Sequence, residues 1–177
     1  MASCPPEQWK AECEDYLKGQ GPWQSRARRY GKVEETLNVM GLNPGDLIVD
    51  VGAGMCDFAR YMYGNGHFMR YLPLDGSIDG RDIEKMETEF PFGDWQVCIE
   101  TVEHMHDPLG LLRVMAARAN RGVVVTTPNP DVTDVLALDS DHKCAISMDD
   151  FIGMGYLPEA VSIHYQDDTI LATWQKP

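Results

Sequence analysis

The stretch LIVDVGAGMCDFARYM, residues 47–62, decides the fold. Its first five residues are apolar except for Asp50, as in a strand that is buried on both faces of a parallel sheet. Gly52-Ala53-Gly54 then turns the chain, and residues 58–63 have the pattern of a short helix. A strand, a glycine turn and a helix together let the backbone approach a nucleotide-like ligand closely, because glycine has no side chain and a helix start has free N–H groups.

The regions on either side of this stretch continue the alternation of strands and helices. Helical patterns cover residues 25–40, 108–120 and 148–154, and Asp107-Pro108 supplies a capping carboxylate and a proline at the first helical position. Apolar runs predict further strands at residues 71–74, 95–99, 123–125, 161–165 and 169–173. This alternation predicts an α/β sheet with right-handed crossovers.

Composition limits the classes of protein that the chain can represent. Its 177 residues, 44% of them hydrophobic, are sufficient for one globular domain. The 28 acidic and 15 basic residues give a net charge of −13, which disfavours nonspecific binding to nucleic acid. Five cysteines without a CxxC pair argue against a disulfide framework and a thiolate zinc site. We see no signal peptide or membrane span and expect a cytoplasmic protein. The oligomeric state is not predicted.

A carboxylate follows the second predicted strand. Asp75 stands at the end of residues 71–74, where a carboxylate can accept hydrogen bonds from both hydroxyls of a ribose. The third position of the dinucleotide glycine pattern is Cys56, so a dinucleotide is the weaker choice of ligand. A tight turn that binds nothing is the alternative.

Four segments in succession resemble the motifs of class I S-adenosylmethionine-dependent methyltransferases. They are LIVDVGAGMCDFARYM (47–62), YLPLDGS (71–77), DWQVCIETVEHMHDPLGLLRVM (94–115) and GVVVTTPNP (122–130). The resemblance covers about residues 33–175. It implies a Rossmann-like sheet, mostly parallel with an antiparallel last strand. It also implies a methyltransferase domain over residues 33–177, preceded by an N-terminal arm or lid over residues 1–32.

The resemblance also assigns a cofactor site for S-adenosylmethionine. The glycine turn would hold the methionine part, Asp50 would orient the turn and Asp75 would bind the ribose. The residues implied are Asp50, Gly52, Ala53, Gly54, Asp75, Gly76, Glu87 near the adenine, and Glu100. The chain departs from the family at Cys56 and in the 19 residues between Asp75 and Trp95, which are too few for the usual helix, strand and helix. We therefore expect a missing helix and a shortened edge strand between the second and fourth strands of the family's sheet.

Two glutamates and a histidine follow the strand at residues 95–99. Glu100, Glu103 and His104 are spaced so that one helical turn can bring them together, and carboxylates with imidazoles suit a divalent cation such as Mg²⁺ or Mn²⁺. With His142, the ExxEH, TPN and DHK segments resemble the small-RNA 3′-terminal 2′-O-methyltransferases, in which the corresponding residues hold a metal. Without a metal, His104 or His142 would act as the general base. Other class I methyltransferases carry a similar segment and bind no metal there, and this alternative stays open.

Three functions are consistent with these patterns. The first is a methyltransferase that acts on an oxygen, in preference to a nitrogen, of a small-molecule acceptor. The second is an RNA ribose 2′-O-methyltransferase, for which a small RNA end would be the nucleic-acid partner. The third is a non-catalytic subunit that binds the cofactor beside a partner protein.

Overall fold

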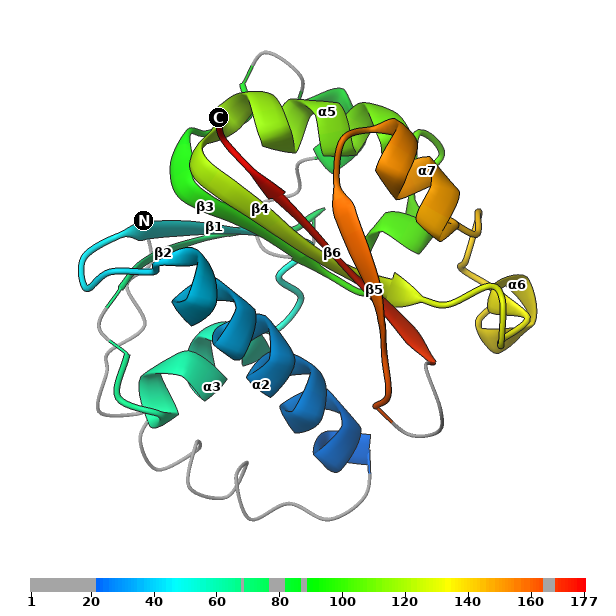
Figure 1. Cartoon of the computed structure of the whole chain (residues 1–177), viewed down its shortest axis with the longest axis horizontal. Coiled ribbons are helices and arrows are strands. Elements are labelled where there is room, and N and C mark those ends of the chain that lie inside the picture. Colours follow the sequence, from blue (N-terminus) through cyan, green and yellow to red (C-terminus); the bar gives the residue numbers. More distant parts are fainter. Residues whose placement is uncertain (1–21, 68, 77–81, 87–88, 164–167) are drawn as a thin grey trace.

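A computed structural model describes residues 22–67, 69–76, 82–86, 89–163 and 168–177. Within these residues six strands form one sheet in the order β2-β1-β3-β4-β6-β5 (Figure 1). Strands β1 to β4 are parallel, whereas β6 runs antiparallel to both β4 and β5. The predicted α/β sheet with an antiparallel last strand is confirmed. The strands are β1 (Leu47–Val51), β2 (Arg70–Leu74), β3 (Gly93–Ile99), β4 (Ala119–Pro128), β5 (Leu157–Val161) and β6 (Thr169–Gln175).

Helices cover both faces of the sheet. Figure 1 shows α2 (Pro22–Met40) and α3 (Asp57–Gly64) on one face, and α5 (Pro108–Arg118) and α7 (Met148–Gly153) on the other. Ile48 packs in the core on the α2 side, whereas its neighbours Val49 and Val51 pack in the core on the α5 side. Because β1 is buried on both faces, it needs the continuous apolar run that the sequence shows.

Helix boundaries follow local capping signals. The Asp107 side chain accepts a hydrogen bond of 2.8 Å from the Gly110 N–H, and Pro108 occupies the first helical position of α5. Ser147 and Asp150 form a capping box at the start of α7. These contacts confirm the predicted helices. No helix in the described part of the chain is long and apolar enough to cross a lipid bilayer.

Two elements near the end of the chain differ from the prediction. The strand expected at residues 161–165 is instead β5, and Val161 is its last residue, paired with Thr169 of β6. Strand β5 lies at the sheet edge with Leu157 and Glu159 exposed, so it lacks the apolar run that we used to recognise strands. Residues 164–167 lie outside the described part. The short helix α6 (Val135–Leu138) lies in a segment for which the sequence patterns predicted no helix or strand.

The segment between β2 and β3 is shortened, as expected. After Gly76 its described residues, 82–86 and 89–92, contain one 3-10 turn, η1 (Ile83–Lys85), with Asp82 as its cap. The prediction of a shortened edge strand is wrong for these residues, because none of them forms a strand and β2 is the edge strand of the sheet. Met86 and Phe90 are instead buried in the core beside α5, so these side chains contribute packing without strand pairing.

Helix α2 crosses the expected boundary between arm and domain. The helix is continuous through residues 32 and 33, and Val33 and Leu37 are fully buried against the sheet. Residues 1–21 of the expected arm lie outside the described residues. The second half of α2 therefore belongs to the core of the domain.

Candidate active site

The glycine turn after β1 has a left-handed backbone. Gly52 and Gly54 have φ angles of 76° and 50°. The N–H groups of Gly52 and Ala53 both donate to the Leu74 carbonyl oxygen, at 2.8 and 3.2 Å, which holds the turn against the end of β2. A Cβ atom on Gly52 would lie 2.2 Å from Thr101 Oγ1. Both the backbone angle and the close approach of Thr101 therefore require glycine at this position.

Cys56, at the position where the family has its third glycine, keeps a glycine-like backbone. Its φ of 59° is left-handed, and the residue immediately precedes α3. A left-handed conformation costs a residue with a side chain about 1–2 kcal/mol. The turn therefore has three left-handed residues, and Cys56 is the one that carries a side chain.

Two aspartates lie next to the turn, and Asp75 bonds to it directly. Asp75 Oδ2 accepts a hydrogen bond of 2.8 Å from the Gly54 N–H and joins the turn to the residue after β2. Asp50 is buried in β1 and accepts a hydrogen bond from the Tyr71 hydroxyl. Burial raises the pKa of Asp50 to about 7, and the nearby Asp75 charge adds to this, although the Tyr71 hydrogen bond acts in the opposite direction.

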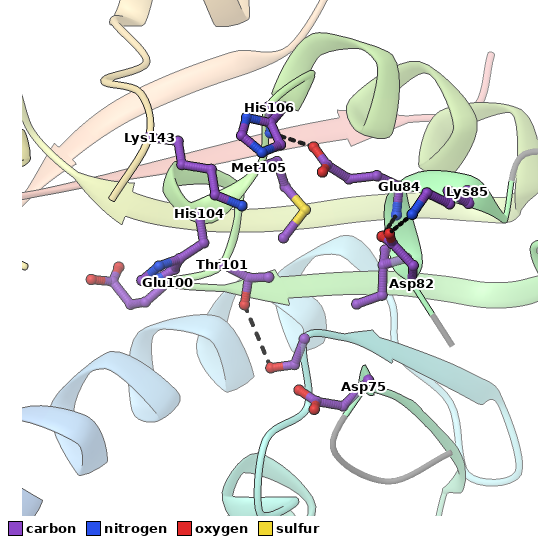
Figure 2. A pocket seen from close by; sticks show the side chains of 13 residues that line it. Asp75, Asp82, Glu84, Lys85, Glu100, Thr101, His104, Met105, His106 and Lys143 are labelled. Carbon is purple, nitrogen blue, oxygen red and sulfur yellow. Dashed lines mark hydrogen bonds and ion pairs between the residues drawn. The ribbon is translucent and has the colours of Figure 1, made fainter. Parts of the chain in front are cut away.

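A cavity of about 660 Å³ opens beside the turn. Asp75 lies at one end in Figure 2, residues 82–85 form one side, and His104, His106 and Lys143 lie at the opposite end. Among the residues expected to bind cofactor, those that line it are Gly52, Asp75, Gly76 and Glu100. Asp50, Ala53 and Gly54 belong to the turn and its strand and are not among the lining residues, and Glu87 lies outside the described residues.

Glu103, His104 and His142 come together at the end of β3. Glu103 and His104 lie on a 3-10 turn, η2 (Val102–His104), and one potential ligand atom from each of the three residues lies within 4.8 Å of the others. The ring centroids of His104 and His142 are 4.6 Å apart. The Glu103 carbonyl oxygen accepts hydrogen bonds from the Lys143 and Cys144 N–H groups, at 2.8 and 3.2 Å. These bonds hold the loop that carries His142 against η2.

Backbone carbonyls set the proton position on both imidazoles. His104 Nδ1 lies 3.2 Å from the Asp141 carbonyl oxygen, and His142 Nδ1 lies 2.6 Å from the Val135 carbonyl oxygen. A carbonyl oxygen only accepts hydrogen bonds, so each Nδ1 must be the donor. In the neutral ring Nε2 then keeps its lone pair, which is the arrangement found in histidines that bind metals.

Glu103 is a buried carboxylate with one neutral partner. Its side chain is 1% exposed, and Oε2 accepts a hydrogen bond of 3.1 Å from Thr127 Oγ1. Burial and the neighbouring charge of Glu100 raise the pKa of Glu103 to about 8. A cation beside Glu103 would favour its ionised form. One carboxylate and two imidazoles with free Nε2 atoms therefore fit a divalent cation.

Glu100 contacts an arginine rather than this cluster. Glu100 Oε2 lies 3.2 Å from Arg29 Nη2 of α2, and Oε1 is buried without a hydrogen-bond partner in the described part of the chain. Its φ of 51° is unusual for a residue with a side chain. Three of the four expected metal ligands thus come together, and the fourth does not. Sequence reasoning did not pair Arg29 with Glu100, because only the tertiary fold places α2 beside the end of β3.

Comparisons with known proteins agree on the fold. No protein-family model and no curated protein matches the sequence. The solved structure of the small RNA methyltransferase HEN1 aligns with a TM-score of 0.63 and 16% identity over 82% of this chain. Magnesium protoporphyrin IX methyltransferase (ChlM) from Synechocystis PCC 6803, with bound SAH, aligns with a TM-score of 0.59 and 10% identity over 97% of this chain and 98% of its own. The chain has the class I methyltransferase fold.

A third structure with the methyltransferase fold matches over its full length. It is a chain of the complex between the Haloferax volcanii Trm112 methyltransferase activator and a methyltransferase, with a TM-score of 0.63 and 14% identity over all of both chains. The alignment with HEN1, in contrast, covers 25% of the HEN1 chain, so our chain spans about a quarter of that protein. In the methyltransferase fold observed here, the glycine turn follows β1, and Glu103 and His104 follow β3, which is the neighbour of β1 in the sheet. His142 joins them from the loop after α6.

Proposed function

We propose that this protein transfers the methyl group of S-adenosylmethionine to an oxygen of a small-molecule acceptor, and that Glu103, His104 and His142 hold a divalent cation, Mg²⁺ or Mn²⁺, beside the acceptor. One observation carries the proposal. His104 lines the cavity at the glycine turn and also belongs to the cluster of possible metal ligands. The cofactor and the cation would therefore meet at the carboxyl ends of β1 and β3, where ligands bind in open α/β sheets.

The cofactor would be held mainly by residues that already fix the turn. Asp75 uses one carboxylate oxygen for the Gly54 N–H and lines the cavity, so it can also accept hydrogen bonds from ribose hydroxyls. Gly52 lines the cavity, so its backbone would lie close to the ligand. Residues 33–177 would form this cofactor-binding domain, with residues 1–32 as its arm.

The histidines would orient the hydroxyl group of the acceptor and assist its deprotonation. When bound, the cation lowers the pKa of a hydroxyl group, and the cofactor supplies an electrophilic methyl group. With a cation bound, Nε2 of each histidine would be a ligand. Without one, Nε2 of His104 or His142 keeps its lone pair and can accept the hydroxyl proton as the oxygen bonds to the methyl carbon and the bond from that carbon to the sulfonium sulfur breaks. The Nδ1 hydrogen bonds keep each ring in place, so alignment of the reacting groups supplies much of the rate.

Calorimetric titration of S-adenosylhomocysteine into the protein tests the cofactor site. We expect micromolar binding by the wild type, and a loss of about tenfold or more in Asp75→Ala, because hydrogen bonds to a charged group contribute about 1.5–3 kcal/mol. Asp75→Asn is the matched control: it keeps an acceptor for Gly54 and should lose less affinity. Absence of binding by the wild type would refute the proposed function, and binding without turnover on any acceptor would support a non-catalytic partner subunit.

A second candidate is methylation of the ribose 2′-oxygen at the end of a small RNA. The cluster of Glu103, His104 and His142 supports it, together with the fold shared with the HEN1 structure. The net charge of −13 opposes it, because phosphate contacts dominate the affinity of proteins for nucleic acids. Incorporation of labelled methyl groups into small RNA and into a small-molecule extract, measured in parallel, decides between the two acceptors.

A further inference from the structure

A second cavity lies beyond the end of β4, in a part of the chain that the proposed cofactor site does not use. Its volume is about 470 Å³, and it is formed by the loop after β4, the start of α6 and one residue of the loop that carries His142. Figure 1 shows α6 at the end of the chain segment that leaves β4. The lining residues are Pro130, Asp131, Val132, Thr133, Asp134, Val135, Leu136 and Ala145.

This cavity is connected to the histidine cluster by a hydrogen bond. Val135 lines the cavity, and its carbonyl oxygen accepts the 2.6 Å hydrogen bond from His142 Nδ1. The His142 ring in turn contacts His104, which lines the cavity at the glycine turn. The two histidines therefore stand between the wall of the second cavity and the first cavity. A molecule bound at the second cavity would thus lie against Val135, the residue that the His142 ring contacts from the other side.

The side chains around the second cavity combine exposed apolar groups with unpaired negative charge. Val132 and Leu136 are each 55% exposed, and neighbouring Leu138 is 58% exposed. Asp131 and Asp134 are exposed, and within the described part of the chain neither has an ion pair. Among the residues that the structure describes, no lysine or arginine lines this cavity. Exposed apolar groups gathered at a concave surface indicate a binding site, and the two carboxylates select against an anionic ligand.

We propose that this second cavity binds the body of the methyl acceptor, and that this acceptor is a small molecule with an apolar part and a protonated amine. The inference rests on the proposed methyltransferase function and names its substrate class. The apolar part would cover Val132 and Leu136, and the amine would face Asp131 and Asp134. A second copy of the chain is a poorer occupant, because two molecules with a charge of −13 repel each other. An RNA end is also a poorer occupant, because its phosphates would be repelled by the same two carboxylates.

Methyl NMR with three phenols of matched size tests this proposal. The probes are tyramine, 4-methylphenol and 4-hydroxyphenylacetate, which share a ring and a hydroxyl but differ in charge. We expect tyramine to shift the methyl signals of Val132 and Leu136, and 4-hydroxyphenylacetate to leave them unchanged. Replacing both carboxylates, Asp131→Asn with Asp134→Asn, should weaken tyramine binding about fivefold, as expected for two exposed ion pairs. The matched controls are Asp149→Asn and Leu157→Ser, exposed positions on other elements, which should leave the affinity for tyramine unchanged.

Several outcomes would overturn the proposal. Equal or tighter binding of the anionic phenol would refute the selection for a cation, and no shift with any of the three probes would refute the site. Shifts of these methyl signals on adding a single-stranded RNA would assign the surface to nucleic acid. Shifts that grow with protein concentration, together with faster sedimentation, would assign it to self-association. The titration with S-adenosylhomocysteine is independent of all these results, so failure of the acceptor site and failure of the methyltransferase function are distinguishable.

Discussion

The glycine turn and the histidine cluster both lie at the carboxyl ends of the parallel strands, but they are built in different ways. The turn is formed by backbone groups between Gly52 and Gly54, held by the residues that end the neighbouring strand. The cluster is formed by side chains, and His142 reaches it on a loop that follows β4 and α6. A site made of local backbone can be recognised from a short stretch of sequence. A site made of distant side chains depends on packing, so the resemblance to a family could suggest its members but local patterns could not.

Substitution of Gly52 by alanine tests the rigidity of the turn and should have the largest effect. The new Cβ would overlap Thr101, and the φ of 76° is unfavourable for alanine, so we expect a loss of about 3 kcal/mol or more in the free energy of unfolding. Gly66→Ala is the matched control, because Gly66 has a φ of 83° and open space around it. Its loss should be about 1 kcal/mol. If urea unfolding gave equal losses of unfolding free energy for the two variants, the Thr101 side chain would be shown to move aside at little cost.

Substitution of His142 by alanine tests whether the cluster acts separately from the turn. We expect Mn²⁺ affinity, measured by electron paramagnetic resonance of the free ion, to fall about tenfold or more, because one of three ligands is lost. Affinity for S-adenosylhomocysteine should stay within about twofold, as for sites without shared contacts. His106→Ala, at an exposed residue outside the cluster, should leave Mn²⁺ binding unchanged. Unchanged Mn²⁺ affinity in His142→Ala would show that the cation binds elsewhere and not at this cluster.

The pH dependence of stability gives a smaller test of the turn. The pKa of Asp50 is about 7 in the folded protein and near its ordinary value of 3.8 in the unfolded chain. Between these values the folded protein holds a proton that the unfolded chain has released, so this group makes stability fall as the pH rises from about 4 to about 7. Asp50→Asn keeps an acceptor for the Tyr71 hydroxyl and cannot titrate.

The comparison of wild type and Asp50→Asn isolates this contribution. Glu103 also has a raised pKa, but it contributes equally to both proteins. We therefore expect the stability of the wild type relative to Asp50→Asn to decrease from pH 4 to pH 7 in chemical denaturation. A relative stability that is constant over this range would mean that Asp50 is ionised in the folded protein.

Much of the fold could be predicted because it depends on local patterns. The apolar run of residues 47–51 requires burial on both faces, and Asp107-Pro108 is a local signal for the start of a helix. Strand β5 was placed wrongly because an edge strand is paired on one side and can carry polar residues, so pairing with β6 rather than its own pattern determines its bounds. The segment after β2 was correctly expected to be short, but its packing through Met86 and Phe90 was not predicted.

The sequence by itself determined the order of strands and helices, the glycine turn and the residue types available for chemistry, because these follow from periodicity, backbone freedom and capping over a few neighbouring residues. Only the tertiary structure decided which of those residues meet. It joined His142 to Glu103 and His104, directed Glu100 to Arg29, and placed a cavity with Asp131 and Asp134 beside the cluster. The physical reason is that contacts between distant segments depend on how elements pack, and packing is a property of the whole chain.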